Sequence, residues 1–525
     1  LAGFFVISFW SVRARMMRPD LTLANYAQTI AQYGDTLLQT LAIALAVALV
    51  TTVLATLGRA EMPEELKPHL REILYRPDRN RIETKAIEQA ALAAGLSVPK
   101  LVDRCGALGP THDYHLGRFL FEHFPRGPHH PATVPFDAPG ELPLAPVRAF
   151  SLDDASTTEI DDALSLTAQD DGSLRLGIHI AAPALGFGPE SPAGAIARER
   201  LSTVYFPGRK ITMLPDAVVA AFTLAEGGAR PAVSLYLDLE PESYAIRASF
   251  SRVERVPIVA NLRHQDVEHL NAVFESAPDG PLPDVPFAHE LRTLYQYALI
   301  LEAERGEQGG FDRPEYLFYV ADDRVRIVER RRGSPLDKLV AEMMIVVNRT
   351  WGKLLADHDV AAIYRAQAQG KVRMTTVPGE HQGLGVSHYA WSSSPLRRYV
   401  DLVNQWQLVA LLDGRSPPFA RNSASLLGAI RDFEATYAAY GEFQDRMEQY
   451  WCLRWLIQEG VRRAPAVVVR ENVVKFRDLP LYVRVPSLPD SPPGTEMTVE
   501  VAGIDLIDAT VTAVHVARPE QVAAG

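Results

Sequence analysis

The stretch Ser151 to Ser165, which reads SLDDASTTEIDDALS, constrains this chain more than any other. It carries five carboxylates within ten residues and no Lys or Arg among them: Asp153, Asp154, Glu159, Asp161 and Asp162. Like charges this close repel, and the repulsion grows once they leave bulk water. Apolar, strand-like runs flank the stretch at 147–152 and 174–182. The pattern therefore predicts carboxylates that are held at the mouth of a buried sheet.

A cluster of hard oxygen ligands in such a place favours a hard divalent cation, Mg²⁺ or Mn²⁺. The pattern of a calcium-binding loop fails, because no Gly and no twelfth-position Glu fall where that loop needs them. Charge runs are usually solvated, however. The residues alone therefore leave two interpretations open, a metal site and an Asp-rich surface turn.

Four motifs follow one another in order between residues 147 and 460. They are FSLDDASTTEIDDAL at 150–164, TVYFPG with MLP at 203–215, AEMMIVVN at 341–348, and GLG with SPLRRYVD at 383–401. The first resembles the T-x-D-x-x-x-x-x-D-x-D-D-A signature of the ribonuclease II and ribonuclease R exoribonucleases, the RNB family, and the others resemble its later blocks. The resemblance implies a processive, hydrolytic 3′-to-5′ exoribonuclease that releases 5′-mononucleotides.

By this resemblance Asp153, Glu159, Asp161 and Asp162 bind metal, and the three aspartates among them are catalytic. Two metal ions held by carboxylates could activate water and relieve charge on the phosphate and the departing oxygen. Glu159 stands where the family has Asp, so its ligation is expected to be longer or water-mediated. Successive residues of an extended chain point to opposite sides, so Asp161 and Asp162 should not grip one ion identically. Asp154 falls at an open position of the motif and is expected to be solvated.

The segment Ser394-Pro395 reads as a helix start, with Ser394 as N-cap and Pro395 at the first helical position. Arg397 and Arg398 would then lie in the first turn, where cations oppose the helix dipole. Helix-end amides with two arginines would make a phosphate site. The alternative is that an arginine pairs with Asp401 one turn on. By resemblance, Arg397 is the catalytic arginine at the scissile phosphate, and both arginines contact RNA.

The resemblance implies three further RNA-binding residues. Tyr205 stacks on the 3′-terminal base, Phe311 forms the opposite face of that clamp, and Glu342 meets the ribose of the terminal nucleotide. Stacking ignores base identity, as a processive nuclease requires. A lone Tyr in a strand would more often be core. Selectivity for RNA would come from contacts to the 2′-hydroxyl.

At 525 residues the chain is long enough for about three domains. Strands dominate up to about residue 260 of the catalytic body and helices follow, which predicts an α+β fold. The predicted parts are an apolar leader at 1–61, a helix-turn-helix-like domain at 62–124, a Pro-rich linker at 125–146, an RNB catalytic domain at 147–462, and an OB-type β-barrel that binds RNA at 463–525. A plain helical packing module and a plain β-cap are the alternatives for the two flanking domains.

Two features set this chain apart from the family that it resembles. The family usually places two cold-shock barrels before the catalytic domain, and the 85 residues of 62–146 are too few for them. The uncharged run Leu37–Leu57 has 21 residues, which is long enough to span a bilayer. A membrane tether, a buried or amphipathic helix, and a segment foreign to the enzyme remain open for it, and the last is favoured.

The net charge of −11 has the wrong sign for binding nucleic acid over the whole surface, so an RNA site must be a local basic groove. We expect single-stranded RNA and RNA with 3′ overhangs as partners, a monomer, and a membrane only if the leader is native. Two lone cysteines, Cys105 and Cys452, fit a reducing cytoplasm. The rival prediction is a non-catalytic, RNA-binding relative with a regulatory role.

Overall fold

The computed structural model describes residues 61–155, 157–306, 314–331, 333–368 and 370–516, with fragments at 11–13, 16–18, 31–32, 34–36 and 38–39. It divides into two units, residues 1–127 with 505–508 and residues 128–504 with 509–525. In the leader, β1 (Ser11–Arg13) pairs with β2 (Met16–Arg18), and most of Leu37–Leu57 lies outside the described residues. Within the described ranges, no helix is long and apolar enough to cross a membrane.

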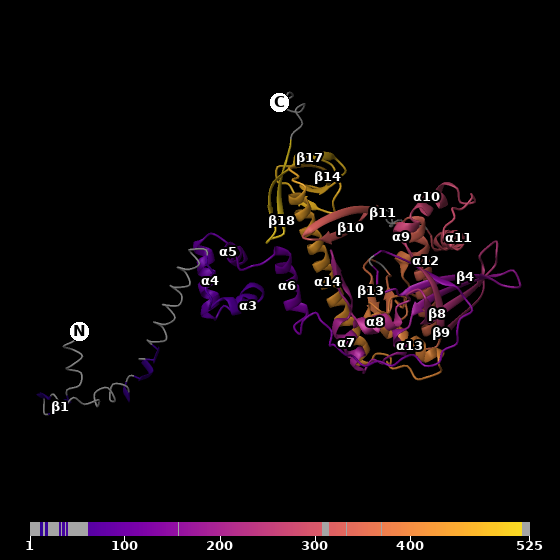
Figure 1. The fold of residues 1–525 in the computed structure, drawn as a ribbon, viewed down its shortest axis with the longest axis horizontal. Helices are drawn as coiled ribbons and strands as arrows, with labels where there is room; N and C mark the ends of the chain where they lie inside the picture. Colours follow the sequence, from indigo (N-terminus) through magenta and orange to yellow (C-terminus); the bar gives the residue numbers. More distant parts are fainter. Residues whose placement is uncertain are drawn as a thin grey trace, which may run out of the picture. The chain divides into compact units, whose positions relative to one another are not determined.

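Five strands of the second unit close into a barrel in the order β3-β4-β5-β8-β9 (Figure 1). They are β3 (Ala149–Asp153), β4 (Asp162–Ala168), β5 (Leu174–Ala181), β8 (Gly228–Leu239) and β9 (Ile246–Arg263). Neighbours are antiparallel, except that β3 runs parallel to β9 and so closes the barrel. The acidic stretch forms the end of β3, the connection that follows, and the start of β4.

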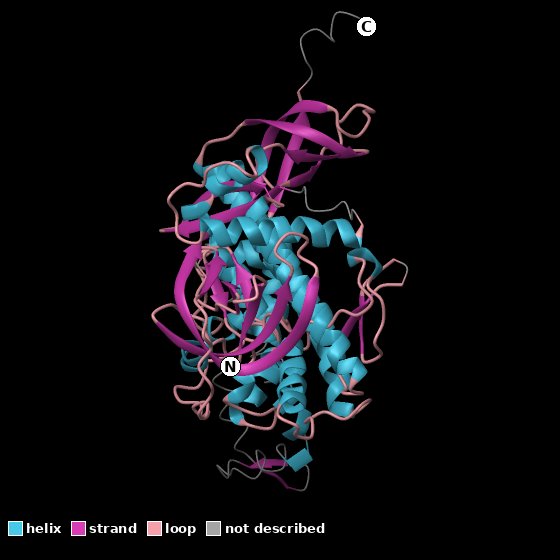
Figure 2. Cartoon of the chain, turned by 90° about the vertical axis from the view of Figure 1, so that its right-hand side faces the viewer, coloured by secondary structure: helices cyan, strands magenta, loops and turns pink. Residues whose placement is uncertain are grey.

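Helices pack beside the barrel, as Figure 2 shows, and share its core. The long ones are α11 (Ala288–Arg305), α12 (Pro335–Asp357), α13 (Tyr399–Leu412) and α14 (Ala424–Gln458). Helix α12 begins where the Ser334 side chain accepts a bond from the Asp337 amide and Pro335 fills the first turn. Its Trp351 is fully buried and donates to Ser251 Oγ of β9 at 2.9 Å. Strands first and helices later agree with the predicted α+β class.

Shorter elements connect the barrel and the helices. Three two-stranded hairpins are β6 (Val204–Phe206) with β7 (Arg209–Ile211), β10 (Pro314–Ala321) with β11 (Arg324–Arg331), and β12 (Tyr364–Ala366) with β13 (Arg373–Thr375). The short helices are η2 (Pro183–Leu185), α7 (Pro192–Arg200), α8 (Asp216–Phe222), α9 (His264–Val267), α10 (His269–Ser276) and η3 (Gln382–Leu384).

A second, C-terminal sheet follows α14 with the strand order β16-β15-β14-β17-β18. Its strands are β14 (Arg463–Arg470), β15 (Val473–Phe476), β16 (Tyr482–Arg484), β17 (Glu496–Asp505) and β18 (Thr510–His515). Alternate residues such as Val468, Val474 and Val499 are buried, as expected for strands with one face on a core. The edge strands β16 and β18 approach each other, so the sheet is nearly closed and is consistent with the predicted OB-type barrel.

The first unit is helical between residues 67 and 123. Its elements are η1 (Lys67–His69), α3 (Leu70–Tyr75), α4 (Ile82–Ala93), α5 (Val98–Arg104) and α6 (Thr111–His123). Helices α4 and α5 are joined by a tight turn in which Gly95 takes a φ of +64°, a conformation that favours glycine. Leu66, Ile87, Leu101 and Val102 form its core. A role of this helix pair in binding nucleic acid stays a prediction.

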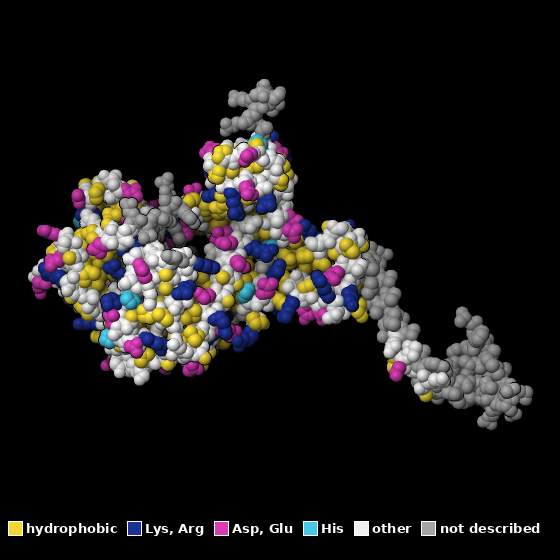
Figure 3. Space-filling view, turned by 180° about the vertical axis from the view of Figure 1, so that it is seen from behind, with side chains coloured by type: hydrophobic (Ala, Val, Ile, Leu, Met, Phe, Trp, Pro, Cys, Tyr) yellow, Lys and Arg dark blue, Asp and Glu magenta, His cyan; other side chains and the backbone are white. Residues whose placement is uncertain are grey.

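Charged side chains of both signs are interspersed on the face shown in Figure 3, rather than gathered into one basic surface. This distribution agrees with the net charge of −11. Any attraction for a polyanion must therefore arise from a few arginines and lysines held in particular places.

Candidate active site

The predicted carboxylates lie together at the mouth of the barrel. Asp153 ends β3 and Asp162 begins β4, and both are half-buried. Glu159 and Asp161, in the connection between these strands, are 4% and 2% exposed. Asp154 is exposed, as expected, and it forms an ion pair with Arg330 at 2.7 Å. The acidic stretch is thus folded into the barrel, so the alternative of a wholly solvated turn does not hold.

Asp161 ties this loop to a segment more than two hundred residues further along the chain. Its Oδ1 accepts a bond from the Leu396 amide at 2.9 Å, and its Oδ2 accepts one from Arg397 Nε at 2.9 Å. Burial raises the pKa of Asp161 to about 8, although the Arg397 guanidinium and the Leu396 amide both oppose that rise. The protonation of Asp161 is therefore coupled to the arginine that it positions.

Asp153 and Asp162 are close enough for their negative charges to repel each other. Burial, then repulsion from Asp153, raises the pKa of Asp162 to about 7, against the opposing effect of Arg397 and Arg398. Burial also raises the pKa of Asp153, while a bond from the Ser151 hydroxyl at 2.6 Å acts in the opposite direction. Two neighbouring carboxylates with raised pKa values form a place where a cation would be stabilised in return.

Mg²⁺ fits this donor set in a restricted way. Among the residues that the structure describes, no group of three or more His, Cys, Asp or Glu side chains could hold a metal ion. Mg²⁺ usually keeps several waters and binds through one or two carboxylates plus substrate phosphates. Asp153 and Asp162 can supply that pair. The oxygens of Asp161 and Glu159 are already engaged by protein donors, so the geometry supports direct ligation by these two residues less well.

Glu159 lies at the centre of a separate network on the β6–β7 hairpin. Its Oε1 accepts a bond from Thr203 Oγ1 at 2.9 Å, and its Oε2 accepts bonds from Lys210 Nζ at 2.8 Å and from the Tyr205 hydroxyl at 3.3 Å. Lys210 also donates to Thr158 Oγ1 at 2.6 Å. Tyr205 and Lys210 are opposite each other in the hairpin register, so Glu159 holds both of its strands.

Sequence reasoning missed Thr203 and Lys210. The signal that could have found Lys210 is the Pro207-Gly208 pair between two short strand-like runs, which predicts a hairpin and places Tyr205 opposite Lys210. Tyr205 itself is 39% exposed, while both of its chain neighbours are buried. The alternative that Tyr205 is a core residue therefore does not hold, and its ring is accessible to a ligand.

The predicted helix start at Ser394 is wrong. Helix α13 begins at Tyr399, and Arg398 before it has extended backbone angles, with φ −133° and ψ 125°. Residues 394–398 instead form a turn in which the amides of Arg397 and Arg398 donate to the Ser394 carbonyl. The Ser394 amide donates to Asp401 Oδ1 at 2.9 Å, so Asp401 holds the turn in place of a helix cap.

The two arginines of this turn have different partners. Arg398 makes a two-pronged ion pair with Asp401, at 2.8 and 2.7 Å, and its guanidinium lies 4.1 Å from the Trp391 ring centroid. The alternative pairing with Asp401 therefore holds for Arg398. Arg397 uses Nε for Asp161, and its side chain is 41% exposed. Burial opposes its charge, but Asp161 and other nearby anionic groups outweigh that effect and raise the pKa of Arg397, so it stays charged.

Comparison with known proteins gives these contacts a family context. The model of the RNB domain matches residues 143–377 and 366–414, together more than half of the chain. This chain belongs to the RNB family. An uncharacterized ribonuclease of Synechocystis is 29% identical over 347 residues, which cover 60% of this chain and 49% of that protein. The chain spans about half the length of the curated relatives it matches.

Solved structures agree on the fold. The Dss1 exoribonuclease of Candida glabrata, determined as an active-site mutant, has a TM-score of 0.70 at 17% identity, over 98% of this chain and 76% of its own. Yeast Ssd1, a pseudonuclease, has a TM-score of 0.58 at 14% identity, over 75% of this chain and 59% of its own. Likeness at this identity shows the fold alone. The RNB fold is therefore shared by nucleases and by a protein that is not one, and the site residues must decide between them.

Two further predicted RNB residues have different outcomes. Glu342 of α12 is 2% exposed and forms an ion pair with Arg305, which also donates to the Leu384 carbonyl at 2.7 Å. Burial raises the pKa of Glu342, although Arg305 opposes the shift. Its contact with a ribose stays a prediction. Phe311 lies outside the described residues.

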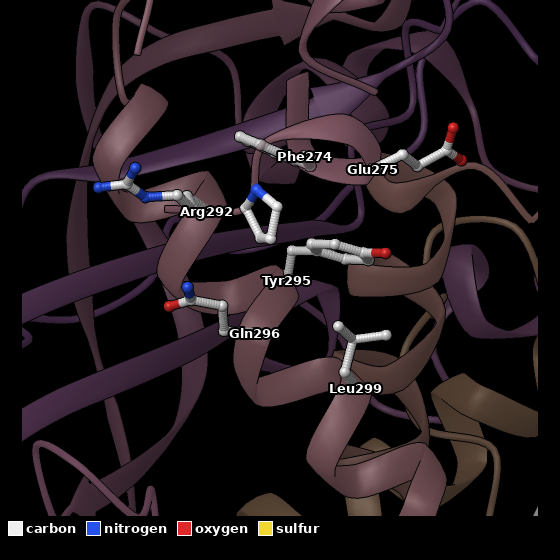
Figure 4. Close-up of a pocket in the computed structure, with 7 residues that line it drawn as sticks. Phe274, Glu275, Arg292, Tyr295, Gln296 and Leu299 are labelled. Atoms are coloured by element: carbon white, nitrogen blue, oxygen red, sulfur yellow. The ribbon is translucent and has the colours of Figure 1, made fainter. Parts of the chain in front are cut away.

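A pocket of about 300 Å³ lies elsewhere on the catalytic domain, between α10 and α11 (Figure 4). Two of the side chains that line it, Phe274 and Tyr295, have stacked rings whose centroids are 5.8 Å apart. None of the candidate active-site residues lines it; the lining is Phe274, Glu275, Pro278, Arg292, Tyr295, Gln296 and Leu299.

Proposed function

We propose that this RNB protein is a hydrolytic, processive exoribonuclease that degrades RNA from 3′ to 5′ and releases 5′-mononucleotides. One observation carries the proposal. Asp153 and Asp162 lie at the barrel mouth, and Arg397, which Asp161 binds at 2.9 Å, is close enough to lower the pKa of Asp162. A phosphate at this place would meet a carboxylate pair suited to Mg²⁺ and a charged, partly exposed guanidinium. Names of the curated relatives, which include ribonuclease II and exoribonuclease 2, support the same class of reaction.

In the proposed mechanism, Asp153 and Asp162 hold the cofactor Mg²⁺, for which Mn²⁺ could substitute. When bound, the metal supplies an activated water and charge stabilisation at the phosphate. Arg397 donates its remaining N–H groups to the scissile phosphate, where charge develops as the bond breaks. Asp161 keeps that guanidinium in place. Tyr205 offers its exposed ring to the 3′-terminal base, and stacking accepts any base.

The decisive experiment is incubation of RNA labelled at its 5′ or 3′ end with Mg²⁺ or EDTA. We expect 3′-labelled RNA to release labelled mononucleotide at once, and 5′-labelled RNA to shorten progressively, in Mg²⁺ only. Binding without cleavage would instead support the non-catalytic, regulatory alternative, for which the fold likeness to a pseudonuclease is the motivation. The retained acidic residues and Arg397 favour the enzyme.

Several wider properties remain proposals. We expect RNA as the macromolecular partner, a monomer, and a cytoplasmic location. The helical residues 62–124 and the C-terminal sheet would add affinity for RNA, as a helix-turn-helix-like domain and an OB-type barrel can. Association with a membrane would depend on the apolar leader at 1–61.

Replacing Lys210 with Met is expected to weaken capture of the RNA 3′ end, because it leaves the buried Glu159 charge unpaired and frees the hairpin that carries Tyr205. The measurement is quenching of a 3′-terminal 2-aminopurine in EDTA, with an apparent affinity lower by about tenfold. The double variant Lys210→Met/Glu159→Gln removes the unpaired charge and should recover most of the quenching. Arg209→Met, in the same hairpin and exposed, is the matched control. Quenching equal to the unmodified protein in Lys210→Met would refute the role.

We also predict digestion into a duplex that carries a 3′ single-stranded overhang, with little activity on a blunt duplex or a 5′ overhang. Residues 62–146 carry helices α3 to α6 and are too few for two cold-shock barrels, so we expect the entrance of the substrate channel beside them to admit a duplex. Only a single strand could thread past Tyr205 to the carboxylates. A gel time course on a stable duplex with a 3′ tail tests this. A firm stop several nucleotides before the duplex would contradict it.

A further inference from the structure

The β10–β11 hairpin has two chemically different faces. Side chains alternate along each strand, and the register places Tyr319 opposite Arg326 and Val320 opposite Val325. Val325 is buried, and its amide donates to Gln458 of α14 at 2.9 Å, so the face of Val320 and Val325 packs on the protein. The opposite face, called here the arginine face, carries Tyr319, Arg324, Arg326 and Arg330, with Glu315 directly opposite Arg330.

The arginine face presents an aromatic ring and cations to solvent. Tyr319 is 43% exposed, and the Arg326 guanidinium lies over its ring, with the guanidinium carbon 4.5 Å from the ring centroid. Arg324 and Arg326 are both exposed. An exposed aromatic beside arginines is the combination that binds single-stranded nucleic acid, since bases stack on the ring and phosphates meet the charges. A strip of exposed arginines is unexpected in a chain of net charge −11, and a role in binding an anionic ligand would explain it.

Contacts at the hairpin's base, tip and packed face connect it with the proposed active site and the C-terminal sheet. The hairpin is labelled β10 and β11 in Figure 1. At its base, Arg330 of the arginine face bonds to Asp154, the neighbour of Asp153. At its tip, Val320 abuts Gly208 of the β6–β7 hairpin, where a Cβ would come within 2.8 Å of the Val320 Cβ. From the C-terminal sheet, Lys475 Nζ donates to the Tyr316 hydroxyl at 3.2 Å.

We propose that the arginine face binds single-stranded RNA upstream of the nucleotides that occupy the active site. One base would stack on the pair that Tyr319 forms with Arg326, and backbone phosphates would pair with Arg324 and Arg326. The inference deepens the proposed function and rests on it for the identity of the ligand. RNA is favoured over an acidic protein as the ligand, because Arg330 of this face contacts Asp154 in the loop that carries the candidate catalytic carboxylates.

The test uses the full chain and measures binding in EDTA, so that no cleavage is required. The variant Tyr319→Ala/Arg326→Ala is compared with unmodified protein on single-stranded RNAs of about 4 and about 25 nucleotides. We expect the Kd for the long RNA to rise about tenfold, and its log Kd against log salt to have a shallower slope by about 1. The Kd for the short RNA should not change, because it fills only the active site.

Arg415→Ala is the matched control, since Arg415 is exposed and lies on the loop after α13. Arg326→Lys keeps the charge, so it should retain the salt slope but lose part of the affinity. An unchanged Kd for long RNA in the double variant would overturn the proposal, as would an equal loss for short and long RNA. A protein that binds both RNAs but degrades neither would refute the exoribonuclease, and the hairpin comparison would still be decided by the Kd values.

Discussion

Replacing Asp162 with Asn is expected to abolish RNA cleavage while RNA binding persists. Asp162 begins β4, and repulsion from Asp153 adds to the rise that burial causes in its pKa; a bound cation would relieve that repulsion. An amide has the same shape but no charge, so the pair would lose half of its attraction for Mg²⁺. Since a metal ion contributes several kcal/mol to such a reaction, the rate should fall on the order of 10³-fold or more.

The measurement has two arms. Cleavage of end-labelled RNA is followed in Mg²⁺, and affinity for the same RNA is measured in EDTA. Without metal, RNA binding depends on arginines, lysines and Tyr205. Asp154→Asn is the matched control, because Asp154 is adjacent in the loop, is exposed, and pairs with Arg330 rather than with the carboxylate pair. It should retain most of the activity. Equal loss of binding and cleavage in Asp162→Asn would count against a metal-holding role.

The acidic cluster could be placed from sequence because its constraint is local. Ten residues between two apolar runs are enough to predict that the carboxylates lie at a strand end. The order of the motifs along the chain indicates the family. Closure of the barrel could not be foreseen in the same way. It depends on the parallel pairing of β3 with β9, about a hundred residues apart, and local alternation of apolar residues does not specify such partners.

The side chains that bind the carboxylates also could not be predicted from local sequence patterns. Glu159 meets Lys210 and Asp161 meets Arg397 only through tertiary folding. The Ser-Pro pattern at 394–395 gave a wrong helix start for a physical reason. Asp401 accepts hydrogen bonds from the Ser394 amide and from two N–H groups of the Arg398 guanidinium. These bonds hold the Arg398 backbone extended, and the helix begins only at Tyr399. A side chain seven residues on thus overrode a capping preference.

Replacing Arg397 with Ala is expected to lower the turnover rate far more than the affinity for RNA. Arg397 donates its Nε–H to Asp161, and its side chain is 41% exposed. Its other N–H groups can therefore bind a phosphate. A fixed charge at that place matters most when the phosphate carries extra charge in the transition state. We expect kcat to fall about 10²–10³-fold with a change in Kd of about threefold or less.

The variant also removes the partner of Asp161, and this second effect must be separated from the first. Burial already raises the pKa of Asp161 to about 8 with Arg397 present, and the loss of the guanidinium would raise it further. The double variant Arg397→Ala/Asp161→Asn has no titratable group at position 161, so this position is neutral at every pH. If the phosphate contact is what matters, the double variant stays as slow as Arg397→Ala. If its turnover recovers, Arg397 serves mainly to neutralise Asp161.

Arg397→Lys refines the same test. Lysine keeps the charge but is a compact point donor, so it cannot bond to Asp161 and a phosphate with the geometry of a guanidinium. We expect turnover between that of Arg397→Ala and that of the unmodified protein, with unchanged affinity. Normal turnover at saturating RNA in Arg397→Ala, combined with weak binding, would make Arg397 a contact that positions the strand. The acceleration would then have to come from Asp153, Asp162 and the metal that they hold.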